Sequence, residues 1–336
     1  MAPLSDMLSQ IRTLGSQLRW AVDVELPPVP PATDVLIAGM GGSGIAGDFV
    51  AALASAGRGR VAVQKGYGPL PGWALDRKPL LIAISFSGNT EETLDIVAAA
   101  SRADLPIVTL TTGGELARIT DENGWPTIAV PGGIQPRAAV GYLFGAAARV
   151  VAAAGLMPDQ VPALMEAAAA ADRATSEGSP SWLLAADIAQ GLAGRIPIIY
   201  GGGPVSGAVA QRWKTQVNEN AKTPSWWSVL PELDHNELVG WEAMPQLTNR
   251  YLGVVALTDE TDHPRVKDRL AHSRALTNNA VPWVAEVAAE GDAPLARLMS
   301  LVVVGDLVSL MLAENAGVDP VPVDTIEKLK KLLTEV

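Results

Sequence analysis

The sequence predicts an α/β protein with two similar, doubly wound domains, each with a mainly parallel sheet flanked by helices. Short apolar runs alternate with stretches of helical spacing, which is typical of a parallel α/β sheet. The second half of the chain repeats the strand, glycine turn and helix of the first half. With 336 residues, 48% of them apolar, the chain can bury a full core, and this length favours two domains over one.

Five strands are predicted in the first half of the chain, because five apolar runs occur there between helical stretches or turns. They are expected at Val35–Ala38, Val61–Gln64, Leu80–Ser85, Ile107–Thr111 and Thr127–Val130. The proline-rich segment Pro27–Pro31 comes before them and is stiff, since each proline fixes its own φ and restricts the residue before it. We therefore expect the first domain to begin just after this connector.

The second half carries the same pattern at two places. Ile196–Gly207 matches Asp34–Gly47, with an apolar strand, a glycine turn and the start of a helix. Tyr251–Asp259 matches Leu80–Gly88, and a helix is predicted after it, from about Pro264 to Leu276. The second domain is therefore expected to be a copy of the first.

Four parts of the chain follow from these patterns. Residues 1–30 are expected to form an N-terminal helix and the proline-rich connector, and residues 31–150 the first domain. Residues 151–192 are rich in alanine, which favours helix, and are predicted to be a helical linker region. Residues 193–336 form the second domain with a C-terminal helix.

Composition excludes several classes of protein. A net charge of −11 argues against a nucleic-acid surface, which needs clusters of basic residues. The chain has no cysteine, so it has no disulfide and no cysteine metal site, and nothing marks it as secreted. Its histidines, His235, His263 and His272, do not have the spacing of a zinc site, so no bound metal is predicted.

Membrane association is not predicted either. The opening segment lacks the long apolar core of a signal peptide. The apolar stretch Leu298–Leu312 is interrupted by Asp306 and is shorter than the ~20 residues that a membrane span needs. We expect a soluble, cytoplasmic protein.

Two loops that follow predicted strands have the composition of a phosphate site. Gly39–Gly44 is rich in glycine, Ser85–Thr90 reads Ser-Phe-Ser-Gly-Asn-Thr, and each precedes a helical stretch. Such loops aim backbone N–H groups and the positive end of a helix dipole at an anion, and hydroxyl groups add donors. One phosphomonoester is expected to be bound by Gly42, Ser43, Ser85, Ser87 and Thr90. The second half lacks the serine-rich cluster, so a single phosphate site is predicted.

The same loops have two other interpretations. The Gly-x-Gly-x-x-Gly pattern that starts at Gly39 fits a dinucleotide site, but the acidic residue expected about 20 positions on is missing from Val61–Lys65. A dinucleotide also leaves the serine-rich loop without a role, so no cofactor is predicted. Alternatively, Ser85–Thr90 is a polar turn in which Thr90 caps the helix that follows.

Five segments along the chain combine into a more specific pattern. They are Gly39–Asp48, Ser85–Thr93, Gln135–Ala139, Trp213–Lys222 and Leu233–Glu237. Together they resemble the bifunctional phosphoglucose/phosphomannose isomerases, over roughly residues 35–333. The Asn-Glu-Asn-Ala-Lys and Asp-His-Asn-Glu sequences within them are far more specific than the glycine loop. The resemblance implies two domains of the sugar-isomerase (SIS) fold and an aldose–ketose isomerase without a cofactor.

The resemblance also implies roles for individual residues. Such an isomerase opens the sugar ring and then moves a proton between C1 and C2 through a cis-enediol. Glu219 is expected to transfer this proton, and Arg137 to stabilise the negative charge of the enediolate. His235 and Lys330 are expected to open the ring. His235 is expected to reach the site of a neighbouring subunit, which implies a homodimer.

Each of these residues also has a purely structural interpretation. Glu219 can pair with Lys222 or Lys214 on the same helix. His235 can be a hydrogen-bonded loop residue, and Arg137 a solvent-exposed cation. These interpretations stay open from the sequence.

Three lysines near the C-terminus are candidates for the ring-opening lysine, and composition alone does not decide between them. Ile326–Leu333 offers Lys328, Lys330 and Lys331, and only one of them can face a site because successive helix positions point ~100° apart. The Ile-x-x-Leu-Lys pattern favours Lys330. Small residues in Val321–Thr325 permit the use of mannose phosphate as well as glucose phosphate.

The predicted function is the interconversion of glucose 6-phosphate, and of mannose 6-phosphate, with fructose 6-phosphate. Two alternatives stay open: a regulatory SIS module that binds a sugar phosphate without catalysis, and an isomerase of a different phosphosugar. A sensor needs only the two loops, so Glu219, His235 and Arg137 in their family contexts argue against it.

Overall fold

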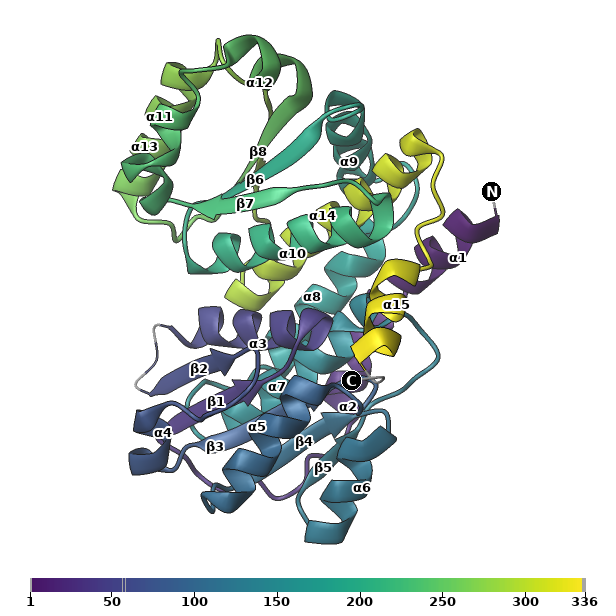
Figure 1. Ribbon diagram of the computed structural model, residues 1–336, viewed down its shortest axis with the longest axis vertical. Helices are drawn as coiled ribbons and strands as arrows, with labels where there is room; N and C mark the ends of the chain where they lie inside the picture. The colour runs from purple at the N-terminus through teal and green to yellow at the C-terminus, as the bar shows by residue number, and fades with distance from the viewer. Residues whose placement is uncertain (1, 56, 58, 334–336) are drawn as a thin grey trace.

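The computed structural model describes residues 2–55, 57 and 59–333 (Figure 1), so the predicted domain ends at residues 1 and 336 lie outside the described residues. Two parallel sheets lie at opposite ends of the molecule, with a layer of helices between them (Figure 1). The predicted α/β class with two mainly parallel, helix-flanked sheets is confirmed.

The first sheet has five strands in the order β2-β1-β3-β4-β5, and all neighbours are parallel. Its strands are β1 (Asp34–Ala38), β2 (Arg60–Gln64), β3 (Leu80–Ser85), β4 (Ile107–Thr111) and β5 (Thr127–Ala129). The helices between them are α3 (Gly41–Ala54), α4 (Gly72–Arg77), α5 (Glu91–Arg102) and α6 (Gly114–Asn123). The predicted strands agree with these because the buried strands of a parallel sheet are continuous apolar runs.

The second sheet has four parallel strands in the order β7-β6-β8-β9. Its strands are β6 (Ile196–Gly201), β7 (Trp226–Val229), β8 (Leu252–Thr258) and β9 (Trp283–Ala288). The segments around them are α10 (Pro204–Ala221), η2 (Glu232–His235), α11 (Glu237–Gly240), α12 (Pro245–Tyr251) and α13 (Pro264–Thr277). This order repeats β2-β1-β3-β4, so the predicted internal repeat holds in the topology.

The opening segment forms two helices where one was predicted: α1 (Ala2–Ile11) and α2 (Leu14–Asp23). The two helices pack against different partners, which explains the break between them. Met7 and Ile11 of α1 lie in a small apolar cluster with residues of η1 (Pro136–Ala138) and of α14 (Pro294–Ala316). In contrast, α2 packs on α7 (Val140–Ala153) and α8 (Val161–Ala174).

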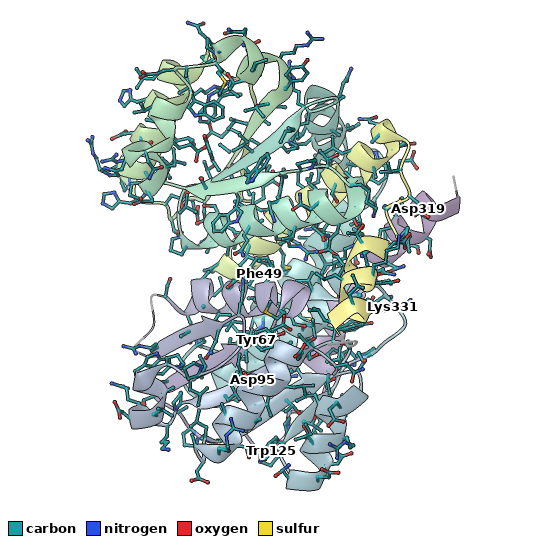
Figure 2. The ribbon with its side chains drawn as sticks, in the orientation of Figure 1. Phe49, Tyr67, Asp95, Trp125, Asp319 and Lys331 are labelled. Atoms are coloured by element: carbon teal, nitrogen blue, oxygen red, sulfur yellow. The ribbon has the colours of Figure 1, made fainter. Side chains whose placement is uncertain are left out.

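The central layer of helices joins the two sheets through one apolar core. Its members include α3, α7, α8, α10, α14 and α9 (Pro180–Gly191), and one cluster of buried side chains runs through all of them. Phe49, labelled in Figure 2, belongs to this cluster and is fully buried. The last helix of the described chain is α15 (Asp324–Leu333), which follows α14 (Figure 1).

Among the described residues, α14 is one helix that is long and apolar enough to cross a membrane, with a mean hydropathy of 2.0. However, 89% of its apolar window is buried inside the protein. Asp306, in the middle of the helix, pairs with Arg212 at 2.8 Å. A buried helix with an internally paired charge is what the core of a folded domain contains.

The strand orders place a topological switch point in each sheet. After β1 the chain returns through α3 to β2, whereas after β3 it continues through α5 to β4 on the other side. The carboxyl ends of β1 and β3 therefore border a crevice of the kind in which open α/β sheets bind ligands. Both predicted phosphate loops lie there, and β6 and β8 form the equivalent point in the second sheet.

Candidate active site

The two predicted phosphate loops are in direct contact at the switch point of the first sheet. The backbone N–H of Phe86 donates to Ser43 Oγ at 3.3 Å, which joins the glycine loop to the serine-rich loop. The hydroxyl oxygens of Ser85 and Thr90 lie 2.9 Å apart. Ser43 and Ser85 are buried. Hydroxyl groups from both loops are thus held at the start of two helices, α3 and α5.

Thr90 stands at the cap position of α5, but its side chain does not cap the helix. Its hydroxyl faces Ser85 instead, so Thr90 leaves the first N–H groups of α5 uncapped and able to bind an anion. Ser87 Oγ accepts the backbone N–H of Asn89 at 3.2 Å. Between them, Gly88 has a φ of +71°, and a Cβ there would collide with the carbonyl oxygen of Gly113. Only glycine fits this turn.

Gly42 brings the glycine loop against the segment that carries Arg137. A Cβ on Gly42 would lie 3.0 Å from the carbonyl oxygen of Pro136 and 3.5 Å from the Cα of Arg137. Any side chain at this position would therefore push the two segments apart. The absence of a side chain lets the glycine loop and Arg137 lie side by side.

Arg137 is buried, with 3% of its surface exposed, and its guanidinium is held by several acceptors. Nε donates to Asn220 Oδ1 at 2.7 Å, and Nη1 donates to Gln135 Oε1 at 3.2 Å. Nη2 donates to the carbonyl oxygens of Pro320 and Val321, at 2.6 and 2.9 Å. Arg137 is not the solvent-exposed cation of the structural interpretation.

Glu219, in the last turn of α10, is the acidic partner of Arg137. Its Oε2 lies 3.7 Å from Arg137 Nη1, and 29% of its side chain stays exposed. Lys222 donates to the backbone carbonyl of Glu219 rather than to its carboxylate. The ion pair that the described side chains form is therefore with Arg137, not with Lys222 or Lys214. The accessible carboxylate beside a fixed cation can exchange protons with a bound molecule.

The site shifts the ionisation of the two basic groups beside Glu219. Burial lowers the pKa of Arg137, and the negative charge of Glu219 opposes that shift. Burial also lowers the pKa of Lys222, and the positive charge of Arg137 adds to the effect. Arginine starts from so high a pKa that Arg137 remains a cation at neutral pH.

His235 lies at the opposite edge of the second sheet from Glu219. Because β6 and β7 are parallel, the turn after β7 that holds His235 is at the edge where α10 begins. Glu219 lies near the other end of α10, which at ~1.5 Å per residue is about 20 Å from the start of that helix. The His235 side chain is exposed. A single protomer does not bring His235 and Glu219 together.

The residues on both sides of His235 are anchored to the domain. Asp234 accepts hydrogen bonds from Arg269 and Ser273 of α13, at 3.0 and 2.8 Å. Glu237 accepts from Tyr200 at 2.5 Å and from Ser228 at 2.6 Å. The exposed imidazole is therefore presented by a segment that is fixed at both ends.

Lys330 lies on α15, and the whole helix is exposed. None of the hydrogen bonds and ion pairs among residues 2–55, 57 and 59–333 joins Lys330 to Arg137 or Glu219. Figure 2 shows Lys331 on the same helix and Asp319 on the segment before it. That segment is tied to the site, because Arg137 and Lys222 both donate to the carbonyl oxygen of Pro320.

Comparisons with known proteins identify the family of this chain. A family model described as the bacterial phospho-glucose isomerase C-terminal SIS domain matches residues 184–333. A bifunctional phosphoglucose/phosphomannose isomerase of Caldicellulosiruptor bescii is 36% identical over 90% of both chains. One of Aquifex aeolicus is 34% identical over 90% of this chain and 91% of the relative. The chain belongs to the bifunctional phosphoglucose/phosphomannose isomerase family.

The fold of this family member is shared with more distant proteins of known structure. The C-terminal domain of a glucosamine-fructose-6-phosphate aminotransferase from Francisella tularensis superposes with a TM-score of 0.69 at 14% identity, covering 94% of this chain and 98% of that one. At that identity, the likeness concerns the fold alone.

In this member of the phosphoglucose/phosphomannose isomerase family, three residues contact Arg137 that the sequence did not single out. Asn220 and Gln135 bind the guanidinium of Arg137, and Arg212 donates to the Arg137 backbone carbonyl at 3.0 Å. Arg212 is also paired with Asp306. Two signals were available. Gln135 and Asn220 lie in segments that carry the family resemblance, and Asp306 interrupts an apolar run, where a charge needs a buried partner.

The second glycine loop of this isomerase-family chain is closed by an internal carboxylate. Asp262 is buried, and its Oδ2 lies 2.6 Å from where a Cβ of Gly202 would stand; its Oδ1 contacts the equivalent point of Gly203. Asp262 Oδ2 also accepts the N–H of Asp259 at 2.8 Å. Burial raises the pKa of Asp262. The carboxylate therefore fills the space beside Gly202 and Gly203, and its negative charge would oppose the binding of an anion at this loop.

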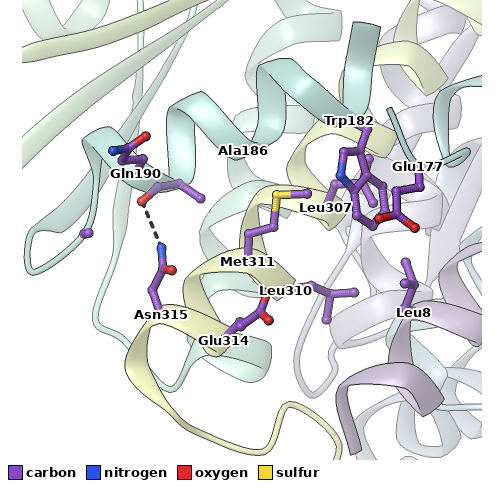
Figure 3. Close-up of a pocket in the computed structure, with 12 residues that line it drawn as sticks. Leu8, Glu177, Trp182, Ala186, Gln190, Leu307, Leu310, Met311, Glu314 and Asn315 are labelled. Atoms are coloured by element: carbon purple, nitrogen blue, oxygen red, sulfur yellow. Dashed lines mark hydrogen bonds between the residues drawn. The ribbon is translucent and has the colours of Figure 1, made fainter. Parts of the chain in front are cut away.

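A cavity of about 850 Å³ lies away from these residues, between α9 and α14 (Figure 3). Trp182, Gln190 and Met311 line it, together with Leu8 of α1, and Asn315 donates to the carbonyl of Ala189 across it at 3.4 Å. None of the candidate site residues is part of its lining. Within residues 2–55, 57 and 59–333, no group of three or more His, Asp or Glu side chains is arranged to hold a metal ion.

Proposed function

We propose that the protein interconverts glucose 6-phosphate, and mannose 6-phosphate, with fructose 6-phosphate, without a cofactor. The observation that carries this proposal is the Arg137–Glu219 pair, which places a partly exposed carboxylate 3.7 Å from a fixed guanidinium. The glycine loop that packs against Arg137 supplies the phosphate end of the site. Membership of the isomerase family supports the same reaction.

Each group has one step in the proposed mechanism. Gly42, Ser43, Ser85, Ser87 and Thr90 bind the phosphate and so fix the sugar by one end. Glu219 removes the proton from C2 of the open-chain aldose and returns it to C1, while the protons on O1 and O2 rearrange through the cis-enediol. The Nη1 side of Arg137 faces the negative charge that develops on the enediolate oxygens.

We also propose that the active enzyme is a homodimer in which His235 acts in the partner's site. Within one protomer His235 and Glu219 lie at opposite edges of the second sheet, so a ring-opening histidine has to come from another copy. Exposed apolar side chains on edge strand β7 and on α11 support an interface along this side of the second sheet, since Trp226 is 57% exposed and Val239 67%. Lys330 is proposed to assist ring opening from α15. A cytoplasmic location fits a chain without cysteine.

Mixed dimers test the shared site. Glu219→Gln and His235→Ala proteins are each expected to be inactive alone. After co-expression, half of the random dimers would contain one intact site, so about a quarter of the wild-type activity is expected. A mixture as inactive as its components would show that His235 does not complete a partner's site.

The reaction itself is tested with a coupled assay of purified protein in EDTA without nucleotide. Fructose 6-phosphate is offered, and glucose 6-phosphate and mannose 6-phosphate are detected separately. Both products are expected. Glucose 6-phosphate alone would restrict the enzyme to one epimer, whereas saturable binding without either product would favour the regulatory module or a different phosphosugar.

A further inference from the structure

In the orientation that the Arg137 guanidinium adopts, four of its five N–H groups donate hydrogen bonds to other residues. Arginine carries one N–H on Nε and two on each Nη. The Nε–H binds Asn220, both Nη2 hydrogens bind the carbonyls of Pro320 and Val321, and one Nη1 hydrogen binds Gln135. The remaining Nη1 hydrogen is on the group that lies 3.7 Å from Glu219. Rotation of the guanidinium would lose these bonds together.

The Nε bond depends on which way the Asn220 amide points. If the amide were reversed, its NH2 group would face the Nε–H of Arg137, and two donors would meet in a buried place. Asn220 and Arg137 are 0% and 3% exposed, so water cannot compensate for that mismatch. The arrangement therefore needs another contact that fixes the orientation of the Asn220 amide.

Ser309 of α14 makes that contact. Its hydroxyl donates to the backbone carbonyl of Asp306 at 2.7 Å, which uses the single hydroxyl hydrogen. Ser309 Oγ can then only accept, and it accepts from Asn220 Nδ2 at 2.9 Å. This places the Asn220 carbonyl oxygen towards Arg137. Ser309 is itself fully buried.

We propose that Ser309 and Asn220 are positioning residues that hold Arg137 with one Nη1 donor free for the reacting oxygens. The inference rests on the role proposed above for Arg137. The hydrogen bonds of this chain are all donated in one direction: from Arg137 Nε to Asn220, from Asn220 Nδ2 to Ser309, and from the Ser309 hydroxyl to the backbone carbonyl of Asp306. Ser309 lies outside every motif that the sequence brought to notice.

The test is a double-mutant cycle on turnover of fructose 6-phosphate. Ser309→Ala is expected to lower kcat about tenfold or more, because misplacement of a catalytic group by ~1 Å can cost about 100-fold. KM is expected to change less than about twofold, since the phosphate loops are untouched. In the Asn220→Asp background, Ser309→Ala is expected to change kcat less than about twofold, because both carboxylate oxygens accept and orientation no longer matters.

Ser300→Ala is the matched control. Ser300 lies on the same helix and also donates to the carbonyl three residues before it, Arg297, at 2.7 Å, but it is remote from Asn220. This control should keep kcat and KM within about twofold of wild type. An equal loss of kcat from Ser309→Ala in both backgrounds, or no loss in either, would overturn the proposal.

A second readout separates this inference from the proposed reaction. The Nε–H resonance of Arg137, assigned by its disappearance in Arg137→Lys, is expected to exchange with solvent at least about tenfold faster in Ser309→Ala than in wild type or Ser300→Ala. If the wild type shows no isomerisation, the reaction fails and the exchange rates still decide whether Ser309 orders Arg137. Unchanged exchange in Ser309→Ala would reject that role.

Discussion

Nη1 of Arg137 lies 3.7 Å from Oε2 of Glu219, and this pair joins the two halves of the molecule. Arg137 belongs to η1, which follows the first sheet, whereas Glu219 lies in the last turn of α10, which packs on the second sheet. Neither half contains Glu219, Arg137 and the two predicted phosphate loops together. The candidate active site is therefore a product of the packing between domains.

Replacement of Glu219 by glutamine tests the proton transfer. Glu219→Gln keeps the shape of the side chain but cannot accept a proton, so kcat is expected to fall by roughly 10²–10⁴. Binding of the sugar phosphate, measured by calorimetry, should stay close to wild type because the phosphate loops are unchanged. Near-normal kcat would remove Glu219 from the mechanism.

Arg137→Lys tests whether a positive charge alone is enough. A lysine cannot reproduce the bonds to Asn220, Pro320 and Val321, so we expect kcat to fall by about 10²–10³, the cost typical of losing a transition-state donor. The melting temperature should fall as well, because the segment before α15 loses its anchor. Full activity with lysine would contradict a role for the fixed guanidinium.

Ser85→Ala tests the phosphate loop. A hydrogen bond to a charged group contributes about 1.5–3 kcal/mol, so KM is expected to rise by roughly 10- to 100-fold with a smaller effect on kcat. Ser55→Ala, at the exposed end of α3, removes a hydroxyl that bonds only to the local backbone and should leave KM unchanged. Equal KM values in both variants would place the phosphate elsewhere.

The Arg212–Asp306 pair makes a prediction about stability. Asp306→Ala leaves the buried Arg212 without its partner, which should reduce the free energy of unfolding by about 3–5 kcal/mol. Asp268→Ala breaks an exposed ion pair with Arg265 and should have little effect. Urea unfolding measures the free energy of unfolding of both variants. Similar losses in the two would show that the buried pair contributes no more stability than the exposed pair.

Asp48 predicts a dependence of stability on pH. Burial raises the pKa of Asp48, and Lys65 partly opposes the shift. Between the unfolded pKa of 3.8 and the higher folded value, the native state holds a proton that the unfolded chain has lost, so stability falls as the pH rises through this window. The difference in unfolding free energy between wild type and Asp48→Asn should therefore decrease from pH 4 upwards. Asp76→Asn, at an exposed position of α4, is the control, and a constant difference would contradict the raised pKa.

Much of the fold was predictable because its signals are local. Apolar runs such as Leu80–Ser85 specify buried parallel strands, and the repeated strand and glycine turn specified the second sheet. The opening helix was predicted as one because its apolar spacing continues through Arg12 and Thr13. The break there depends on α1 and α2 packing against different helices, which spacing does not report.

The site shows the same division. The sequence by itself determined the residue types: hydroxyls and glycines after two strands, the Asn-Glu-Asn-Ala-Lys run with Glu219, and the Asp-His-Asn-Glu run with His235. Only the tertiary structure decided that Glu219 pairs with Arg137 rather than Lys222, that Ser309 orients Asn220, and that Asp262 closes the second glycine loop. Local propensity and spacing act along the chain, whereas desolvated charges and amides take their partners from whichever segments the packed core brings beside them.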